Sequence, residues 1–403
     1  MSFNSHESNF ENFETQCIHG GLFPEEQFGS LSTPVYLTST FVLEGVGKDK
    51  GYDYSRTGNP TRTALAQHLA VLEGGVACSV HGTGIASITT VLHHFKAGDH
   101  ILVTQDCYGG THRLISQNLT HFGLEADFVD FTDVTKLEAH VKPNTKAIWV
   151  ESPTNPVLKL CDLEALGTFS KKHNLTYIVD NTFASPAGQN PIKFGADLVV
   201  HSTTKYINGH CDCTGGAVIS RTKAWGERIA WLTNCLGTGQ SPFDSWQILR
   251  GSKTLSVRYK AQQASAASIA QWLESHPAVA KVHFPGLKSH PQHELAKRQQ
   301  KGFGAIIAFE VRGTPAEARA VVENTKLIKL AESLGGVQSL IEVPAFQSHA
   351  SMTPQARINA GISDTLVRFS VGLEDSEDLI RDLDQALSKV GKGECVLTAA
   401  AGC

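Results

Sequence analysis

The sequence predicts an α/β fold, with a large, mostly parallel sheet domain and a smaller C-terminal α/β domain. The chain has 403 residues, and at roughly 150 residues per domain this length predicts two or three domains. From Gly74 to about residue 220, short apolar runs alternate with longer amphipathic stretches, a pattern typical of buried parallel strands joined by crossover helices. Near residue 260 the pattern changes to an Ala-rich helical segment, which indicates a second unit.

The N-terminal region fits neither pattern and is predicted to form an arm. Residues 51–60 are rich in Gly, Asn, Asp and Pro, a composition typical of a loop. Leu65, Leu69 and Leu72 then have helical spacing, and Gly74-Gly75 follows as a stop signal. We therefore predict an arm over residues 1–62, a large domain over 63–258 and a C-terminal domain over 259–403.

Five short apolar runs are predicted as the buried strands of the large sheet. They cover residues 101–103, 147–150, 177–179, 198–200 and 217–219, and most of them end abruptly in polar residues. Ligands of open α/β sheets bind at the carboxyl ends of strands. The chemistry is therefore expected at these polar ends.

The C-terminal domain is predicted from a few clear elements. A helix is expected over residues 261–273, and strands over 305–309 and 366–370. A closing helix over 376–387 carries Leu379, Leu383 and Leu387 at four-residue spacing. A second α/β unit is the simplest interpretation.

Composition excludes several classes of partner and compartment. Lys and Arg number 35 against 39 Asp and Glu, so no general positive field favours nucleic acid. The longest apolar runs are far shorter than the roughly 20 residues of a membrane helix, and the polar N-terminus lacks the pattern of a secretory signal. Nine scattered cysteines, an odd number, argue against a disulfide framework. A reduced, cytoplasmic protein that binds small molecules is expected.

The strongest local signal is Lys205, in the segment His-Ser-Thr-Thr-Lys that follows the 198–200 run. A desolvated lysine has a lowered pKa, which makes its neutral amine nucleophilic. Ser202 and Thr204 are predicted from the two-residue strand period to point to one side, where they could bind a phosphate. The alternative is a lysine that extends from a strand end to solvent, and this segment alone leaves both open.

Two further residues are expected at the same edge of the sheet. Asp180 ends the 177–179 run, and a carboxylate beside a pyridine nitrogen would keep that ring protonated, as in pyridoxal phosphate enzymes; the alternative is an acidic helix cap. Tyr108 stands before two glycines after the 101–103 run and could stack on a planar cofactor, or it could be a core tyrosine.

A glycine-containing turn over residues 80–87 runs into an apolar segment. Free backbone N–H groups of Gly84 and Ile85 at a helix start would hold an anion, although a plain tight turn is the alternative. A dinucleotide fingerprint needs glycine at position 87, where Ser87 stands. This disfavours a Rossmann-type NAD-dependent dehydrogenase.

Two other candidates concern a carboxylate and a metal. Arg368 lies in an otherwise apolar predicted strand. Its guanidinium could bind the carboxylate of a ligand in a bidentate manner, or it could form an ion pair with a residue such as Glu374, and the sequence leaves both possibilities open. Residues 210–213 read His-Cys-Asp-Cys, but this spacing is too short for a usual zinc site and no second cluster completes it. We therefore expect no metal, and a Gly-rich loop over 209–216 with buried thiols.

Taken together, these residues resemble the cysteine and methionine metabolism family of pyridoxal phosphate enzymes. The resemblance runs from about Thr15 to Leu387 through seven motifs in the same order. The motifs cover residues 54–61, 108–111, 151–156, 179–183, 202–206, 331–336 and 368–372. The resemblance implies pyridoxal 5'-phosphate as cofactor, fold type I, and a homotetramer whose active sites are shared across a dimer interface.

The resemblance also implies a role for each matching residue. Lys205 would bind the cofactor covalently, Asp180 would hold its ring nitrogen, and Tyr108 would stack on its ring. The cofactor phosphate would be bound by the Gly84 and Ile85 backbone, Ser202 and Thr204, and by Tyr54 and Arg56 of a neighbouring subunit. The substrate α-carboxylate would be bound by Arg368, Ser333 and Asn155. The far end of the substrate would be contacted by Arg113 and Gln338.

The implied reaction takes place at the γ-carbon of an amino-acid substrate. The resemblance is closest to the cystathionine γ-synthases, in which cysteine replaces the γ-substituent of an activated homoserine; cystathionine γ-lyases and a paralogue with shifted substrate are the alternatives. Gly110 stands where methionine γ-lyases have cysteine, which disfavours that activity. Gln338 and Cys235 stand where the family usually has glutamate and asparagine. If the protein were a binding protein without a cofactor, Lys205 would have no chemical role.

Overall fold

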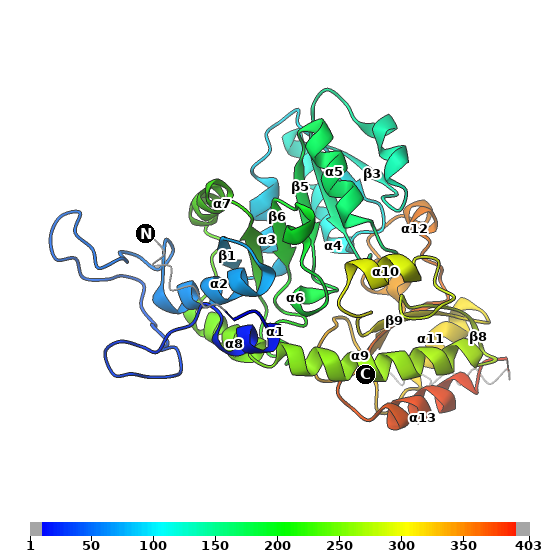
Figure 1. Ribbon diagram of the computed structural model, residues 1–403. Coiled ribbons are helices and arrows are strands. Elements are labelled where there is room, and N and C mark those ends of the chain that lie inside the picture. Colours follow the sequence, from blue (N-terminus) through cyan, green and yellow to red (C-terminus); the bar gives the residue numbers. More distant parts are fainter. Residues whose placement is uncertain (1–9, 392–403) are drawn as a thin grey trace, which may run out of the picture.

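The computed structural model describes residues 10–391 and contains two β-sheets with helices packed around them (Figure 1). The first nine residues of the expected arm and the last twelve of the expected C-terminal domain lie outside the described residues. The α/β architecture, with a larger and a smaller sheet, agrees with the prediction. None of the helices in residues 10–391 is long and apolar enough to cross a membrane.

The larger sheet has seven strands in the order β1-β7-β6-β5-β4-β2-β3. The five strands from β6 to β3 are parallel, and β7 is antiparallel to both of its neighbours. The strands are β1 (Ala77–His81), β2 (His100–Thr104), β3 (Glu125–Val129), β4 (Thr145–Glu151), β5 (Thr176–Asp180), β6 (Leu198–His201) and β7 (Gly216–Ser220). The polar carboxyl ends of β4, β5 and β6 therefore lie side by side.

Strands β1 and β3, the two edge strands of this sheet, were not predicted from the sequence. Both interleave polar and apolar residues and are only partly buried, whereas every residue of β2 is buried. An edge strand lacks a neighbour on one side and so carries no continuous apolar run. The signal that identified the central strands was therefore weak at the edges.

Helices cover both faces of the larger sheet and complete two separate apolar clusters. Ile148 and Val179 belong to the cluster on one face, and Trp149 and Ile178 belong to the cluster on the other, as the two-residue strand period requires. The helices of this part are α2 (Pro60–Glu73), α3 (Gly84–Leu92), α4 (Gly109–Gln117), α5 (Leu163–His173), α6 (Ser185–Gly188), α7 (Lys223–Leu236) and α8 (Pro242–Ser252), with 3₁₀ turns η1 (Leu119–Phe122), η2 (Val134–His140) and η3 (Pro191–Phe194).

The helix expected after residue 65 begins earlier, at Pro60. The Asn59 side chain caps it by accepting from the Thr61 N–H, and Pro60 occupies the first turn, where its missing N–H costs nothing. Gly74 ends the helix in the left-handed region with φ of 79°, which glycine adopts without strain. The stop signal predicted at Gly74 is confirmed.

The smaller sheet has five strands in the order β10-β11-β12-β9-β8. The expected strand at residues 366–370 and the expected closing helix at 376–387 are confirmed with the same bounds. The elements are α9 (Leu255–Ser275), β8 (Val279–His283), α10 (His293–Gln299), β9 (Ile306–Val311), α11 (Pro315–Glu323), β10 (Lys329–Leu330), β11 (Leu340–Glu342), η4 (Pro344–Phe346), α12 (Pro354–Ala360), β12 (Leu366–Ser370) and α13 (Ser376–Leu387). The domain limits at 62 and 258 fall inside α2 and α9 and stay predictions.

The expected arm contains one helix, α1 (Phe13–His19), followed by a long irregular segment. Residues 20–59 form neither helix nor strand apart from isolated bridges, and Figure 1 shows this segment as blue loops projecting from the left side of the molecule. Leu31, Val42 and Val46 on this segment are at least 86% exposed. A single chain leaves these apolar side chains uncovered.

Candidate active site

A cavity of about 290 Å³ opens at the carboxyl ends of β4, β5 and β6. It brings together ten of the fourteen residues singled out in the sequence, although they come from seven separate segments. The ten are Gly84, Ile85, Tyr108, Asn155, Asp180, Ser202, Thr204, Lys205, Ser333 and Arg368. The expectation that the polar strand ends converge is confirmed.

Lys205 lies on a turn and not at the strand tip, because β6 already ends at His201. Its amine donates to the Ser333 hydroxyl at 2.7 Å. Burial, and next the positive charge of Arg368, lower the Lys205 pKa to about 8. The side chain faces the cavity, so the alternative of a lysine extended to solvent is wrong.

We expect this low pKa to be visible in the apoprotein. The neutral amine is the form that reacts with aldehydes, so labelling of Lys205 by pyridoxal and cyanoborohydride should rise with pH through a midpoint of about 8. An unperturbed lysine has a pKa of about 10.4. Site-resolved mass spectrometry measures the midpoint at Lys205; a midpoint near that unperturbed value would contradict the burial of Lys205.

Asp180 is buried at the end of β5 and accepts from the Thr182 N–H at 3.0 Å and the Thr182 hydroxyl at 2.6 Å. Burial raises the pKa of this carboxyl, and the two Thr182 hydrogen bonds counteract that rise. The Asp180 side chain lines the cavity and does not cap the following helix α6, whose cap position is Ala184.

Glu151 is a further candidate site residue. It belongs to the motif over residues 151–156 but was not singled out from the sequence. It lies beside Asp180 in the register of β4 and β5 and lines the same cavity. Burial, followed by the charge of Asp180, raises the Glu151 pKa well above its usual value. Its Oε2 accepts from the Tyr108 N–H at 2.8 Å. Glu151 therefore fixes the backbone of Tyr108, whose partly exposed ring lines the cavity.

An anion cradle lies where α3 begins. Thr83 caps this helix by accepting from the Ala86 N–H, while within residues 10–391 no acceptor meets the N–H groups of Gly84 and Ile85. The Ser202 hydroxyl is likewise without a hydrogen-bond partner in the described chain. Such N–H groups at a helix start bind anions.

The strand-period argument for Ser202 and Thr204 is wrong, because both residues lie on the turn after β6. Tertiary packing nevertheless brings both to the cavity. The Thr204 hydroxyl is already engaged with the backbone of Gly215, accepting from its N–H at 2.9 Å. Ser202 thus has the freer of the two hydroxyl groups.

Glycine at position 84 allows the close approach between α3 and Ser202. A Cβ at Gly84 would come within 2.7 Å of the Ser202 Cβ, whereas a Cβ at Gly82 would meet nothing within 4 Å. We expect Gly84→Ala to weaken cofactor binding about tenfold or more, because a displaced cradle loses charge-assisted hydrogen bonds. Gly82→Ala is the matched control; equal affinities of the two apoproteins in a pyridoxal phosphate titration would contradict the cradle.

Arg368 is buried on β12 and held by three partners. Its Nη1 donates to Asn155 Oδ1 at 3.1 Å, and its Nη2 donates to the Ser333 carbonyl at 2.9 Å and pairs with Glu342 at 3.1 Å. The ion pair considered with Glu374 is wrong, because β11 and β12 place Glu342 directly opposite Arg368. Glu374 instead accepts from Ser339.

Four expected site residues do not line the cavity of the single chain. Tyr54 and Arg56 lie on the arm, where Arg56 donates to Asn234 at 2.8 Å. Gln338 is exposed on the segment before β11. Arg113 is exposed on α4. Burial raises the Tyr108 pKa, and the positive charge of Arg113 lowers it, so Arg113 lies near the Tyr108 ring.

The loop over residues 209–216 differs from expectation. Cys211 is exposed and Cys213 is half-buried, so the expected burial of both thiols is wrong. Over the described part of the chain, no group of three or more His, Cys, Asp or Glu side chains is arranged to hold a metal ion.

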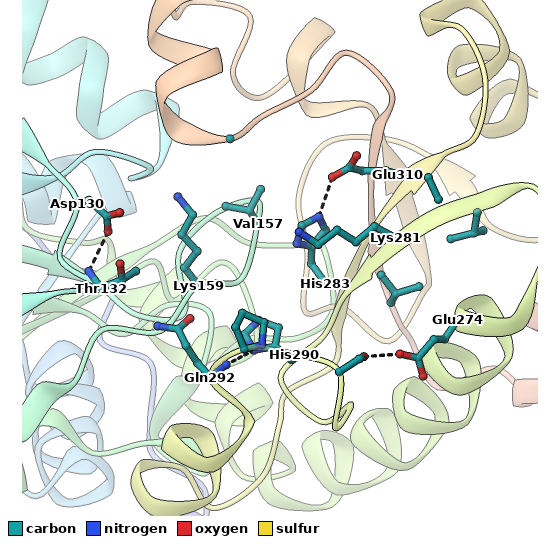
Figure 2. A pocket seen from close by; sticks show the side chains of 16 residues that line it. Asp130, Thr132, Val157, Lys159, Glu274, Lys281, His283, His290, Gln292 and Glu310 are labelled. Atoms are coloured by element: carbon teal, nitrogen blue, oxygen red, sulfur yellow. Dashed lines mark hydrogen bonds and ion pairs between the residues drawn. The ribbon is translucent and has the colours of Figure 1, made fainter.

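A larger cavity, of about 700 Å³, lies apart from Lys205, between the 130–132 and 157–159 loops and the strand β8. Figure 2 shows that its polar side chains are largely engaged with one another: His283 pairs with Glu310, and the Gln292 N–H donates to His290. None of the fourteen expected site residues lines it. The smaller cavity around Lys205 is therefore the candidate active site.

Comparisons with known proteins agree with this geometry. The family described as "Cys/Met metabolism PLP-dependent enzyme" matches residues 14–388. The chain is 46% identical to a cystathionine gamma-lyase of Bacillus subtilis, over 94% of this chain and 99% of that protein. It is 47% identical to a cystathionine beta-lyase of Lactococcus lactis subsp. cremoris, over 93% and 99%. A cystathionine gamma synthase of Xanthomonas oryzae pv. oryzae, solved in complex with cystathionine, superposes with a TM-score of 0.92 at 44% identity, over 94% and 98%.

Proposed function

Since the chain belongs to the Cys/Met metabolism PLP-dependent enzymes, we propose that it is a cystathionine γ-synthase, which replaces the γ-substituent of an activated homoserine by the sulfur of cysteine. It is a pyridoxal phosphate-dependent enzyme of sulfur amino-acid metabolism with the fold of the type I class. The relatives include lyases and a synthase, so the exact reaction rests on the arrangement of side chains around the cavity.

The cavity residues fit pyridoxal phosphate. The unpartnered N–H groups of Gly84 and Ile85 and the Ser202 hydroxyl suit its phosphate, and the buried carboxyl of Asp180 suits its ring nitrogen. The amine of Lys205, with its pKa lowered to about 8, suits covalent attachment to its aldehyde. When bound, the cofactor serves as an electron sink for bonds at the α- and β-carbons of the substrate.

The remaining chemistry belongs to the chain itself. Arg368 would bind the substrate α-carboxylate, because its guanidinium is fixed by Asn155 and the Ser333 carbonyl. This anchor would orient the substrate so that the Lys205 amine can take the proton from the α-carbon and, after releasing it, a second proton from the β-carbon. The γ-substituent would then leave with the electrons of its C–O bond, as the free carboxylate of the acyl group. The thiolate of cysteine would form the new bond at the γ-carbon, and protons would return to the β- and α-carbons.

The observation that favours an acylated donor is the pair of guanidinium groups near Tyr108. Burial raises the Tyr108 pKa, and the positive charges of Arg113 and Arg368 both lower it. The two arginines come from different elements, α4 and β12. Arg368 is buried and Arg113 is exposed. A donor with two carboxylates, such as O-succinylhomoserine, would satisfy both cations.

The proposal also covers the assembly and the compartment. Tyr54 and Arg56 do not line the Lys205 cavity of their own chain, so we propose that they reach the phosphate of a neighbouring subunit in a cytoplasmic homotetramer. The exposed apolar side chains of the arm, such as Leu31 and Val42, support an arm that is covered by another subunit.

A product assay with the purified holoenzyme tests the reaction. With O-succinylhomoserine and cysteine we expect cystathionine as the main product, because the thiolate adds before the intermediate is lost to water. With cystathionine alone we expect little 2-oxobutyrate. Dominant 2-oxobutyrate from cystathionine would instead support the γ-lyase activity that several relatives carry.

A further inference from the structure

A fully buried ion pair lies next to the cofactor-facing strand ends, outside the cavity lining. Glu73 is the last residue of α2 and His201 is the last residue of β6, and they are 0% and 1% exposed. The His201 Nε2 lies 2.7 Å from the Glu73 Oε2. A buried charged pair is costly unless further hydrogen bonds satisfy it, so its surroundings decide what it does.

Amide donors complete the coordination of the Glu73 carboxylate. Asn181 Nδ2 lies 3.4 and 3.3 Å from its two oxygens, and Asn190 Nδ2 lies 3.5 Å from Oε1. Asn181 directly follows Asp180, and His201 directly precedes Ser202. One carboxylate from α2 therefore joins the ends of β5 and β6, which carry the residues proposed for the ring nitrogen and the phosphate.

The pair also has an electrostatic effect on the cavity. Burial raises the Asp180 pKa, the Thr182 hydrogen bonds lower it, and the charge of His201 lowers it further. The other charged groups that face this network are Glu151 on β4, beside Asp180, and Lys301, which donates to Asn190 at 2.7 Å and acts on the Glu73 carboxylate.

We propose that Glu73 and His201 are positioning residues for the cofactor, which fix Asp180 and Ser202 relative to each other. The inference rests on the placement of pyridoxal phosphate in the Lys205 cavity proposed above. It does not depend on whether the reaction is replacement or elimination. It gives α2 a role beyond packing, since this helix connects the arm to the floor of the cavity.

Two variants test the pair independently. Glu73→Gln keeps the shape of the side chain without its charge, and His201→Gln keeps a donor near the Nε2 position without the imidazolium. In titrations of each apoprotein with pyridoxal phosphate we expect about tenfold weaker binding at neutral pH, because Asp180 and Ser202 would no longer be held in place for charge-assisted hydrogen bonds to the cofactor. Each variant tests the proposal by itself, so the other variant still gives a result if one of them misfolds.

The pH profile separates this role from a merely structural one. The charge of His201 lowers the Asp180 pKa, so the pH above which cofactor affinity reaches its plateau should move upward in His201→Gln. Glu138→Gln is the matched control, because it breaks a Glu–His pair of 2.8 Å at the surface. The control should leave both affinity and pH profile unchanged. Unchanged affinity in either folded test variant, or an unchanged profile in folded His201→Gln, would overturn the proposal.

A double-variant cycle with Asp180→Asn locates the effect. If the pair acts through Asp180, Glu73→Gln should weaken cofactor binding far less in the Asp180→Asn background than in the wild type. Additive losses would overturn the positioning role and leave the Asp180 assignment intact. If Asp180→Asn alone changes neither affinity nor the absorption spectrum of the cofactor, the Asp180 assignment and this inference both fail.

Discussion

Lys205→Ala is expected to lower kcat by about 10⁴-fold, because the variant loses the group proposed to move protons at the α- and β-carbons. Pyridoxal phosphate should still bind weakly, through the Gly84 and Ile85 N–H groups and Asp180, since these contacts do not involve the lysine. Steady-state kinetics measure the loss. Borohydride treatment followed by peptide mapping should place a pyridoxyl label on Lys205 in the wild type and leave the variant unlabelled at that position.

Lys297→Ala is the matched control for this change. Lys297 is a half-exposed lysine of α10 whose amine pairs with Glu294, so its removal should leave kcat within twofold of the wild type. Turnover of Lys205→Ala close to that of the control would remove Lys205 from the reaction. The label and the kinetics are independent measurements of the same assignment.

Arg368→Ala is expected to damage both stability and substrate binding. The change leaves the Glu342 carboxylate, which is 1% exposed, without its cation, and breaking such a buried pair costs about 3–5 kcal/mol. The loss of a bidentate carboxylate ligand should lower kcat/KM by about 100-fold or more. Chemical denaturation and steady-state kinetics measure the two effects.

A double variant separates the two roles of Arg368. Combining Arg368→Met with Glu342→Leu replaces the buried pair by apolar groups, which is often neutral for stability. We expect most of the unfolding free energy to return while kcat/KM stays low. Recovery of kcat/KM in the double variant would contradict the proposed anchor. Arg298→Ala breaks a pair with Asp162 at the surface and should change stability by less than about 1 kcal/mol.

The sequence predicted the central elements well because their signals are local. Fully buried strands such as β6 require continuous apolar runs, and α13 carries leucines at helical spacing. The edge strands β1 and β3 were missed, since partial burial permits polar residues in them. The early start of α2 at Pro60 was missed because its first turn is specified by a cap and a proline, and not by apolar periodicity.

The candidate site was also predictable in part. Lys205, Asp180 and Tyr108 stood out because each lies at the end of a buried strand or four residues after it, at the edge of the sheet where ligands bind. Glu151 was not singled out, although it occupies the same kind of position on β4. Its importance comes from the neighbouring carboxyl of Asp180 and from the Tyr108 N–H that it accepts, which are contacts between strands.

The sequence by itself determined the fold class, the polar strand ends and the residue types suited to pyridoxal phosphate, because each depends on neighbours close in the chain. The tertiary structure decided which groups meet. The antiparallel register of β11 and β12 selected Glu342, 26 residues from Arg368, over Glu374, which is only six residues away. Packing of α2 against β1 and β7 brought Glu73, at the end of this helix, to His201 and Asn181. Such pairings depend on strand register and helix packing, and the free energy that selects them comes from burial of the whole core.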